Sequence, residues 1–295
     1  MRDSIWKDWD KAPFAVLLVT PEYEFLIRHP QPSQDFNLIG YDSPLKSNLY
    51  FRKRTQRTDF LATFPAIKGS MIPTIVVGQA ENTTARTSTA WVVTLLHEHF
   101  HQLQYSQPGY FADVNALNLS GGDKTGMWML NYPFPYDKKD VQEQFSVLSK
   151  VLVETLKASS KEERQEKLVV YAKAEREFEQ MLGPNDCKYF SFQLWQEGVA
   201  RYTEYQVAQF AATKYKPSKE FRALKDFTPF GQVANSTYEG IFEQLLTRKL
   251  GESRREMFYP FGAAKALLLD RVAPSWRDRY FAEKFDLGHF CVKER

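Results

Sequence analysis

The spacing of three histidines constrains the fold of this chain more than any other feature. The sequence holds five histidines, and three of them fall within residues 97–101, which read His-Glu-His-Phe-His. Residues four apart lie on one face of an α-helix, so His97 and His101 can present both imidazoles to one metal ion if this segment is helical. His99 lies about 200° around the helix from His97 and points away from that ion. We interpret His99 as a hydrogen-bonded structural histidine.

The flanking sequence predicts the helix that this arrangement needs. Thr87 and Ser88 offer capping hydroxyls ahead of an apolar run that ends at Leu96. The helix is expected to continue through Gln104 and to stop before the Pro-Gly pair at 108–109. The apolar run indicates a buried helix, and buried histidines need partners.

Read as His97-Glu98-x-x-His101, the segment matches a signature of zinc hydrolases. The two histidines would bind the ion, and Glu98 would hold a water at the metal and take its proton. Catalytic zinc usually has three protein ligands and keeps one position open for water. We therefore expect a third ligand elsewhere in the chain, and one zinc ion per chain.

A downstream segment resembles the gluzincin metallopeptidases, in which a glutamate on a second helix completes the zinc site. Residues 197–204, Glu-Gly-Val-Ala-Arg-Tyr-Thr-Glu, are similar to the Glu-Gly-x-Ala-x-Tyr-x-Glu stretch of the aminopeptidase N-like branch. The resemblance implies that Glu197 is the third ligand. It also implies that Glu204 accepts a hydrogen bond from a ligand histidine and so fixes the orientation of its ring. The small Gly198 suits a close approach of the two ligand helices.

A third segment extends the resemblance. Residues 259–263 read Tyr-Pro-Phe-Gly-Ala and are similar to the Tyr-x-x-Gly-Ala segment of the same branch. By that resemblance the hydroxyl of Tyr259 faces the oxyanion of the tetrahedral intermediate. Tyr202 and His289 are the next candidates for this role. The isolated His29 is read as an ordinary histidine.

The resemblance covers three short segments and departs from the family between them. Residues 102–196 separate the histidines from Glu197, whereas the spacer is short in the aminopeptidase N-like family. The chain also has no Gly-x-Met-Glu-Asn-like segment, which in that family binds the amino terminus of the substrate. The resemblance therefore implies the zinc chemistry of the clan and not aminopeptidase specificity.

The periodicities predict an α+β fold, which the resemblance implies to be a thermolysin-like zincin core. Residues 1–86 read as a mixed-sheet lobe, with β-like runs at 14–19, 24–27, 47–51 and 74–77. Residues 87–295 read as a helical lobe that carries the metal site, with an inserted helical pair at about 137–182.

One strand has a functional expectation. In gluzincins an edge strand just before the active-site helix pairs with extended substrate, and residues 72–78 occupy that place. Pro73 favours an edge position for this strand. An interior strand without a ligand is the alternative.

Composition limits the partners. The chain is 43% hydrophobic and 25% charged, which is typical of a globular protein. A net charge of +3 is too small to indicate nucleic acid, and no apolar stretch is long enough to span a membrane. The expected partner is a peptide or protein substrate, and the oligomeric state stays open.

The two cysteines and the N-terminal residues give evidence on the cellular compartment of the protein. Cys187 and Cys291 are compatible with one disulfide or with two free thiols. Residues 1–10 are too charged for the apolar core of a signal peptide. A cytoplasmic protein is expected from the chain as given, or a secreted or periplasmic one if a leader has been removed.

These features predict a zinc-dependent metallopeptidase in which Glu98 is the general base and Tyr259 stabilises the oxyanion. Two alternatives remain open. One is a zinc hydrolase of a non-peptide amide or ester, which has the same ligand set. The other is a non-catalytic binding protein that retains the gluzincin fold.

Overall fold

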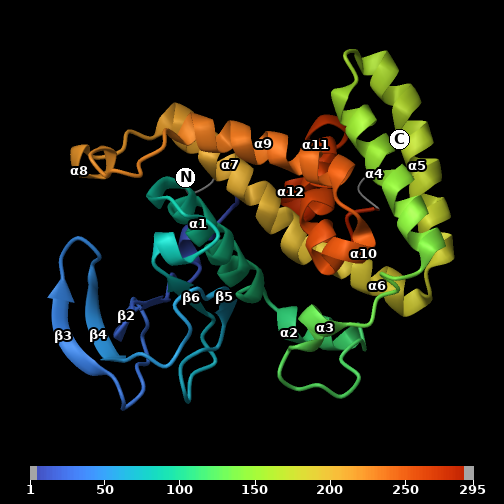
Figure 1. Cartoon of the computed structure of the whole chain (residues 1–295). Helices are drawn as coiled ribbons and strands as arrows, with labels where there is room; N and C mark the ends of the chain where they lie inside the picture. The colour runs from blue at the N-terminus through green and yellow to red at the C-terminus, as the bar shows by residue number, and fades with distance from the viewer. Residues whose placement is uncertain (1–4, 289–295) are drawn as a thin grey trace. The chain divides into compact units, whose positions relative to one another are not determined.

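The computed structural model describes residues 5–288 and shows an α+β protein (Figure 1). The chain divides into two compact units, each built from two segments of sequence. The first unit contains Met1–Pro108 and Thr203–Asn235, and the second contains Gly109–Tyr202 and Ser236–Arg295. This division differs from the expected boundary at residue 86, because helix α1 (Ser88–Tyr105) packs on the sheet within the first unit.

A six-stranded mixed sheet forms the body of the first unit, as predicted. Its strand order is β3-β4-β2-β1-β6-β5. β1 and β6 run parallel, and the other neighbouring strands are antiparallel. The strands are β1 Val16–Val19, β2 Tyr23–Ile27, β3 Asn37–Asp42, β4 Ser47–Lys53, β5 Leu61–Phe64 and β6 Thr74–Gly78.

The expectation that residues 72–78 form an edge strand is wrong. β6 lies between β1 and β5, and all five of its residues are buried. Pro73 precedes the strand, where its missing N–H removes no ladder hydrogen bond. The two edges of the sheet are β3 and β5.

Helix α1 covers one face of the sheet through apolar and polar contacts. Trp91 and Leu95 pack against a core that includes Val16, Ile75 and Val77. The indole Nε1 of Trp91 also donates to the main-chain oxygen of Gly78 at 2.8 Å.

The far end of α1 is anchored by a buried amide. The side-chain nitrogen of Gln102 donates to the main-chain oxygens of Ala15, at 2.9 Å, and Pro73, at 2.8 Å. Hydrogen bonds thus tie α1 to the last residue of β6 and to the residues that directly precede β1 and β6, which fixes its position on the sheet.

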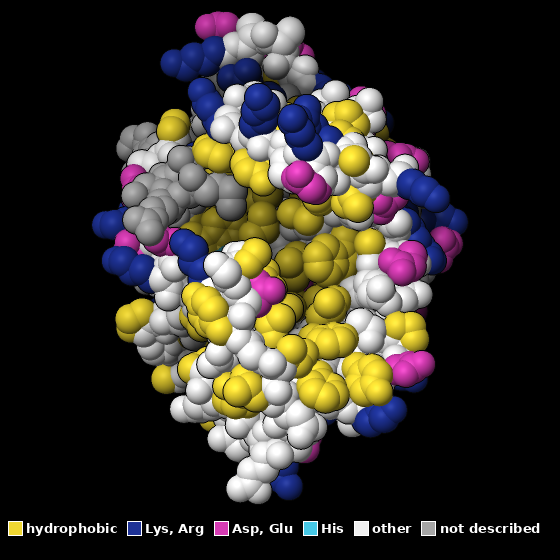
Figure 2. All heavy atoms as spheres, turned by 90° about the vertical axis from the view of Figure 1, so that its left-hand side faces the viewer, with side chains coloured by type: hydrophobic (Ala, Val, Ile, Leu, Met, Phe, Trp, Pro, Cys, Tyr) yellow, Lys and Arg dark blue, Asp and Glu magenta, His cyan; other side chains and the backbone are white. Residues whose placement is uncertain are grey.

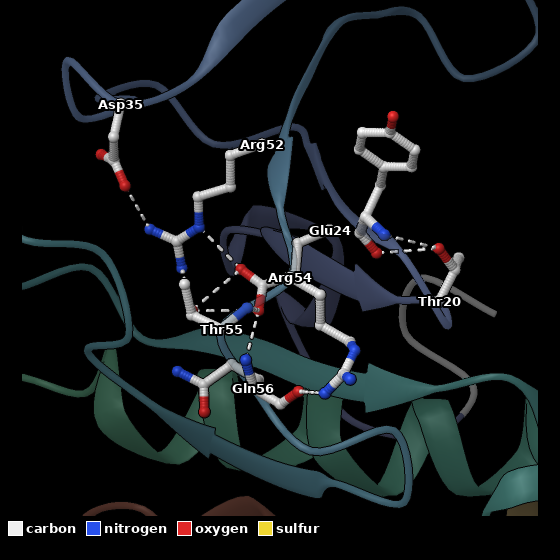
Figure 3. Close-up of polar contacts among 8 residues, drawn as sticks. Thr20, Glu24, Asp35, Arg52, Arg54, Thr55 and Gln56 are labelled. Atoms are coloured by element: carbon white, nitrogen blue, oxygen red, sulfur yellow. Dashed lines mark hydrogen bonds and ion pairs between the residues drawn. The ribbon is translucent and has the colours of Figure 1, made fainter.

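A buried carboxylate organises the segment that leads from β4 into β5 (Figure 3). Glu24 has no exposed surface, and Arg52 lies opposite it on β4. The carboxylate oxygens of Glu24 accept hydrogen bonds from Nε of Arg52 and from the main-chain nitrogen of Thr55, each at 2.6 Å. They also accept one from the main-chain nitrogen of Gln56. Arg52 in turn contacts Asp35 at 2.7 Å. The network holds the chain that precedes β5 against the sheet.

The edge strand β3 presents an apolar outer surface. Leu38, Ile39 and Tyr41 are each more than half exposed. Figure 2 looks at this side of the sheet and shows hydrophobic side chains gathered over it.

The second unit is helical, and two helices lie in the range 137–182, where a helical pair was expected. They are α4 (Lys139–Lys157) and α5 (Lys161–Met181), and the side chain of Ser160 caps α5 by accepting from the main-chain nitrogen of Glu163. Aromatic rings fill the core between the helices, among them Phe145, Phe178, Phe190, Phe258 and Phe261.

The other α-helices of the described residues are α2 Tyr110–Ala116, α3 Trp128–Asn131, α6 Pro184–Gln193, α7 Val199–Lys214, α8 Lys219–Arg222, α9 Phe230–Thr247, α10 Leu250–Ser253, α11 Phe258–Val272 and α12 Trp276–Arg279. A π-helical turn, Leu194–Gly198, joins α6 to α7. Across residues 5–288, no helix is both long and apolar enough to cross a membrane.

Candidate metal centre

The helix expected around the histidines is present as α1, but its N-terminus is capped differently from the prediction. Neither Thr87 nor Ser88 caps α1 through its own side chain. Instead the carboxylate of Asp226 accepts from the main-chain nitrogen of Ser88 at 2.6 Å and from its hydroxyl. These bonds hold the pKa of the Asp226 carboxyl below its usual range. A negative charge at this end of α1 also complements the helix dipole.

The two predicted ligand histidines converge. His97 and His101 are buried, and their Nε2 atoms lie 3.1 Å apart. On the other side of each ring, Nδ1 of His101 lies 2.7 Å from Oε1 of Gln104, and Nδ1 of His97 lies 2.7 Å from Oε1 of Glu204. An oxygen therefore lies beside Nδ1 of each ring.

This arrangement fits a metal ion. With the ring hydrogen on each Nδ1, both Nε2 atoms carry a lone pair that can bind a cation. The two Nε2 atoms lie 3.1 Å apart, close enough to bind the same ion. Tetrahedral zinc with bonds of about 2.0–2.1 Å would hold two nitrogen ligands about 3.3 Å apart. The ligand atoms of His97, Glu98 and His101 all lie within 4.8 Å of one another.

Glu204 lies beside one of the predicted ligand histidines. It belongs to α7 and is buried, with its carboxylate 2.7 Å from Nδ1 of His97. A carboxylate in this position fixes the tautomer and the direction of the ring. Its role beside a metal stays a prediction.

Glu98 is held by a residue that the sequence did not indicate. The Glu98 side chain is buried, and the hydroxyl of Thr63 lies 2.8 Å from its Oε2 and 3.0 Å from its main-chain oxygen. Thr63 belongs to the edge strand β5. No local pattern marks it, because the contact depends on how α1 packs on the sheet.

His99 and His29 lie outside the candidate metal centre and have structural contacts. His99 is the structural histidine that was predicted, since it is buried, stacks on Phe14 and Trp9, and lies 2.9 Å from Gln102 Oε1. Burial lowers the pKa of His99 to about 4, so its ring is uncharged at neutral pH. His29 is also buried, and its Nδ1 accepts from the main chain.

Two residues named from the sequence, His289 and Cys291, lie outside the described residues. The Sγ of Cys187 contacts the main-chain oxygen of Glu179 at 3.3 Å. Whether Cys187 pairs with Cys291 therefore stays open.

Glu197 and Tyr259 lie in the second unit, on either side of one arginine. Nη1 of Arg255 donates to the hydroxyl of Tyr259 at 2.6 Å and lies 3.5 Å from Oε1 of Glu197. Burial and the charge of Glu197 raise the pKa of Tyr259 well above its usual value. Arg255 was missed, although it precedes Tyr259 by the four residues that place side chains on one helical face.

A crossing at two glycines brings these groups together. A Cβ added to Gly198 would lie 2.4 Å from Cα of Gly262, on α11. The sequence predicts that Gly198 lets its helix approach the histidine helix. The close approach is instead made with α11, the helix that carries Tyr259. The π-helical turn that contains Glu197 packs on α11 at this point. Such turns are frequent at functional sites.

Tyr202, the alternative donor, is engaged elsewhere. Its hydroxyl lies 2.6 Å from Oδ2 of Asp270, and its ring is fully buried against Trp276. These contacts indicate a structural role. The predicted residues are thus found in two groups, with His97, Glu98, His101 and Glu204 in the first unit and Glu197 and Tyr259 in the second.

Comparisons with known proteins add nothing to this picture, because no family model, curated protein or solved structure matches the chain.

Proposed function

We propose that the protein is a zinc-dependent hydrolase of peptide bonds, built on a thermolysin-like zincin core. One observation carries the proposal: two buried imidazoles face each other through Nε2 while oxygens hold both Nδ1 atoms. His97, His101 and Glu197 would hold one zinc ion per chain. When bound, zinc polarises the carbonyl of the substrate and lowers the pKa of water.

Glu98 is the proposed general base. It takes one proton from water as the oxygen of that water bonds to the carbonyl carbon, and it then gives the proton to the leaving nitrogen as the C–N bond breaks. The water is thereby divided between the new carboxyl group and the new amine. Thr63 keeps Oε2 of Glu98 in a defined position through its 2.8 Å contact.

Tyr259 is the proposed donor to the oxygen that becomes negative during attack. Its raised pKa keeps the hydroxyl protonated at neutral pH, as a donor must be. Arg255 donates to the phenolic oxygen at 2.6 Å, and the same hydroxyl is hydrogen-bonded to Glu197, so the phenol is held between the arginine and the proposed ligand.

The choice of Glu197 as third ligand is supported by its position in the chain. It precedes Glu204 by seven residues, which is about two helical turns and keeps the two side chains on one face. The resemblance to gluzincins assigns it the same role.

The open edge of strand β5 favours a peptide as the substrate over other amides. The main-chain nitrogen of Gly78 donates to the oxygen of Phe60, so the alternating ladder turns the main-chain groups of Leu61 and Thr63 toward the open edge. An extended peptide could add to this edge beside the residue that holds Glu98. The role first assigned to residues 72–78 is therefore proposed for β5.

Elemental analysis tests the metal site directly. Protein purified without chelators should hold one zinc per chain, and His101→Ala should lose it, whereas the control His29→Ala should keep it. Absence of zinc from the wild type, or unchanged zinc affinity in His101→Ala, would contradict the proposal. A peptide library then tests whether the zinc-loaded protein cleaves peptide bonds.

A further inference from the structure

Arg255 has hydrogen-bond donors that the protein does not use. A guanidinium carries five N–H donors in a rigid fork. Both hydrogen-bonding contacts of Arg255 within the described part of the chain are made by Nη1, to Tyr259 and Glu197. The donors on Nε and Nη2 have no hydrogen-bond partner among these residues, and the side chain is 21% exposed. One edge of the fork is thus free to bind a ligand.

The charge of Arg255 is only loosely compensated. The contact to Glu197 is 3.5 Å long and uses a single nitrogen, whereas strong charge-assisted bonds measure about 2.7–2.9 Å. Tyr136 and Tyr189 add no negative charge, because burial raises the pKa of both phenols. If Glu197 also holds a divalent cation, its one negative charge is shared further. An anionic group on the ligand would restore the balance.

A carboxylate matches the free edge of this fork. The two oxygens of a carboxylate accept two parallel hydrogen bonds from the N–H groups of a guanidinium. A ligand with one negatively charged oxygen cannot form this pair of bonds. The neighbouring Arg254 lacks these properties, since it is 54% exposed and lies 3.3 Å from Asp137.

The spacing indicates which carboxylate this is. Nη1 of Arg255 and the hydroxyl of Tyr259 are 2.6 Å apart, so groups bound to the two side chains lie close together. Successive residues of a peptide are spaced by about 3.8 Å. A carbonyl on Tyr259 and a carboxylate on Arg255 can therefore belong to adjacent residues.

We infer that Arg255 binds the terminal carboxylate of the substrate, so that the enzyme removes the last residue of a peptide. This inference rests on the proposed function, because it takes Tyr259 to mark the position of the scissile carbonyl.

Ligand binding tests the inference without relying on catalysis. Titration calorimetry on the full chain, both zinc-loaded and metal-free, would compare N-acetyl-phenylalanine with N-acetyl-phenylalanine amide. The acid should bind roughly tenfold to a hundredfold more tightly to the wild type, as expected for charge-assisted hydrogen bonds. Arg255→Met should abolish the preference, Arg255→Lys should keep part of it, and the adjacent control Arg254→Met should retain it.

A third test compound distinguishes a C-terminal carboxylate from a side-chain carboxylate. N-acetyl-aspartic acid amide carries its carboxylate on the side chain and should bind no better than the phenylalanine amide. Equal binding of acid and amide by the wild type, or a preference that survives Arg255→Met, would overturn the inference, as would tight binding of the aspartyl ligand. The wild-type comparison decides the matter even if a variant does not fold.

The inference and the proposed function fail in different ways. A carboxylate preference in a protein that cleaves no peptide would leave Arg255 as a binding residue and remove the hydrolase. Cleavage of peptides with free and amidated C-termini at equal rates, together with equal ligand affinities, would retain the hydrolase and remove the role of Arg255.

Discussion

At the scale of single residues, the proposed chemistry depends on which atoms carry hydrogens. With ring hydrogens on the Nδ1 atoms, which lie beside oxygens of Gln104 and Glu204, the Nε2 atoms of His101 and His97 can serve as the proposed ligands. The hydroxyl of Thr63 likewise lies beside the carboxylate of Glu98. The proposed ligands and the proposed base thus each lie against a polar neighbour that has no proposed contact with the substrate.

Replacement of Glu98 by glutamine separates catalysis from metal binding. Glu98→Gln should retain zinc and the fold, because Glu98 is not a proposed ligand and the amide has almost the same shape. Hydrolysis should fall by roughly a hundredfold or more, because the general base is lost. Steady-state kinetics and zinc analysis of the same preparation check this, and comparable turnover by the variant would exclude the mechanism.

Tyr259→Phe removes a single hydroxyl. It should lower kcat by roughly tenfold to a thousandfold while zinc binding is kept, as when one oxyanion donor is removed. Tyr202→Phe is the matched comparison, because it removes a hydroxyl that contacts Asp270 and should affect stability more than kcat. A loss of kcat in Tyr202→Phe alone would move the role to that residue.

Residues with a local signature could be predicted, and those that depend on tertiary packing could not. His97, Glu98 and His101 follow from helical spacing within five residues. Thr63 and Asp226 act on α1 from 35 and 138 residues away, and nothing in the sequence links them to it. Their roles appear only once the strand and the loop are packed.

At the scale of elements, the crossing of α11 with the π-helical turn determines how Glu197 and Tyr259 meet. A Cβ at Gly262 would lie 2.6 Å from Cα of Gly198 and 2.9 Å from the main-chain oxygen of Leu194. Main-chain atoms cannot move aside as a flexible side chain can. A side chain at either Gly198 or Gly262 would therefore clash with the main chain of the other glycine.

Gly262→Ala should force the two elements apart. We expect a loss of about 1–3 kcal/mol in the free energy of unfolding, as for other overpacked sites. The control is Gly240→Ala on α9, where the nearest atom to a new Cβ is a flexible amide nitrogen 3.7 Å away. That change should be neutral or stabilising by about 0.5–1 kcal/mol, because alanine favours a helix. Denaturant unfolding measures both, and an equal response would contradict the crossing.

The strands show where element prediction succeeds. The four expected strands became β1, β2, β4 and β6, whose apolar runs are bounded by turn residues. β3 was missed because most of its side chains are exposed and give no apolar alternation. β5 was missed because its sequence, Leu-Ala-Thr-Phe, lacks the continuous run of β-branched and leucine residues that marks β1. The absence of β5 from the prediction also explains why β6 was taken for the edge.

At the scale of the whole molecule, bound zinc should stabilise the folded chain, and more so when all three proposed ligands are present. Glu197→Ala should reduce the rise in melting temperature that zinc produces, relative to the wild type, without abolishing it as His101→Ala should. Thermal denaturation with zinc and with a chelator measures this. An unchanged zinc response in Glu197→Ala would remove it from the ligand set.

The interleaved order of the two units affects how the protein is made. Residues 1–108 leave the ribosome first and contain the whole sheet and the histidine helix. Glu204 is synthesised about a hundred residues later, after a long segment that belongs to the other unit, and contacts of this separation form slowly. The nascent chain therefore carries His97 without its carboxylate partner for several seconds, at about 5–20 residues per second. The contact between His97 and Glu204 therefore cannot form before most of the residues that separate the two segments of the first unit have been made.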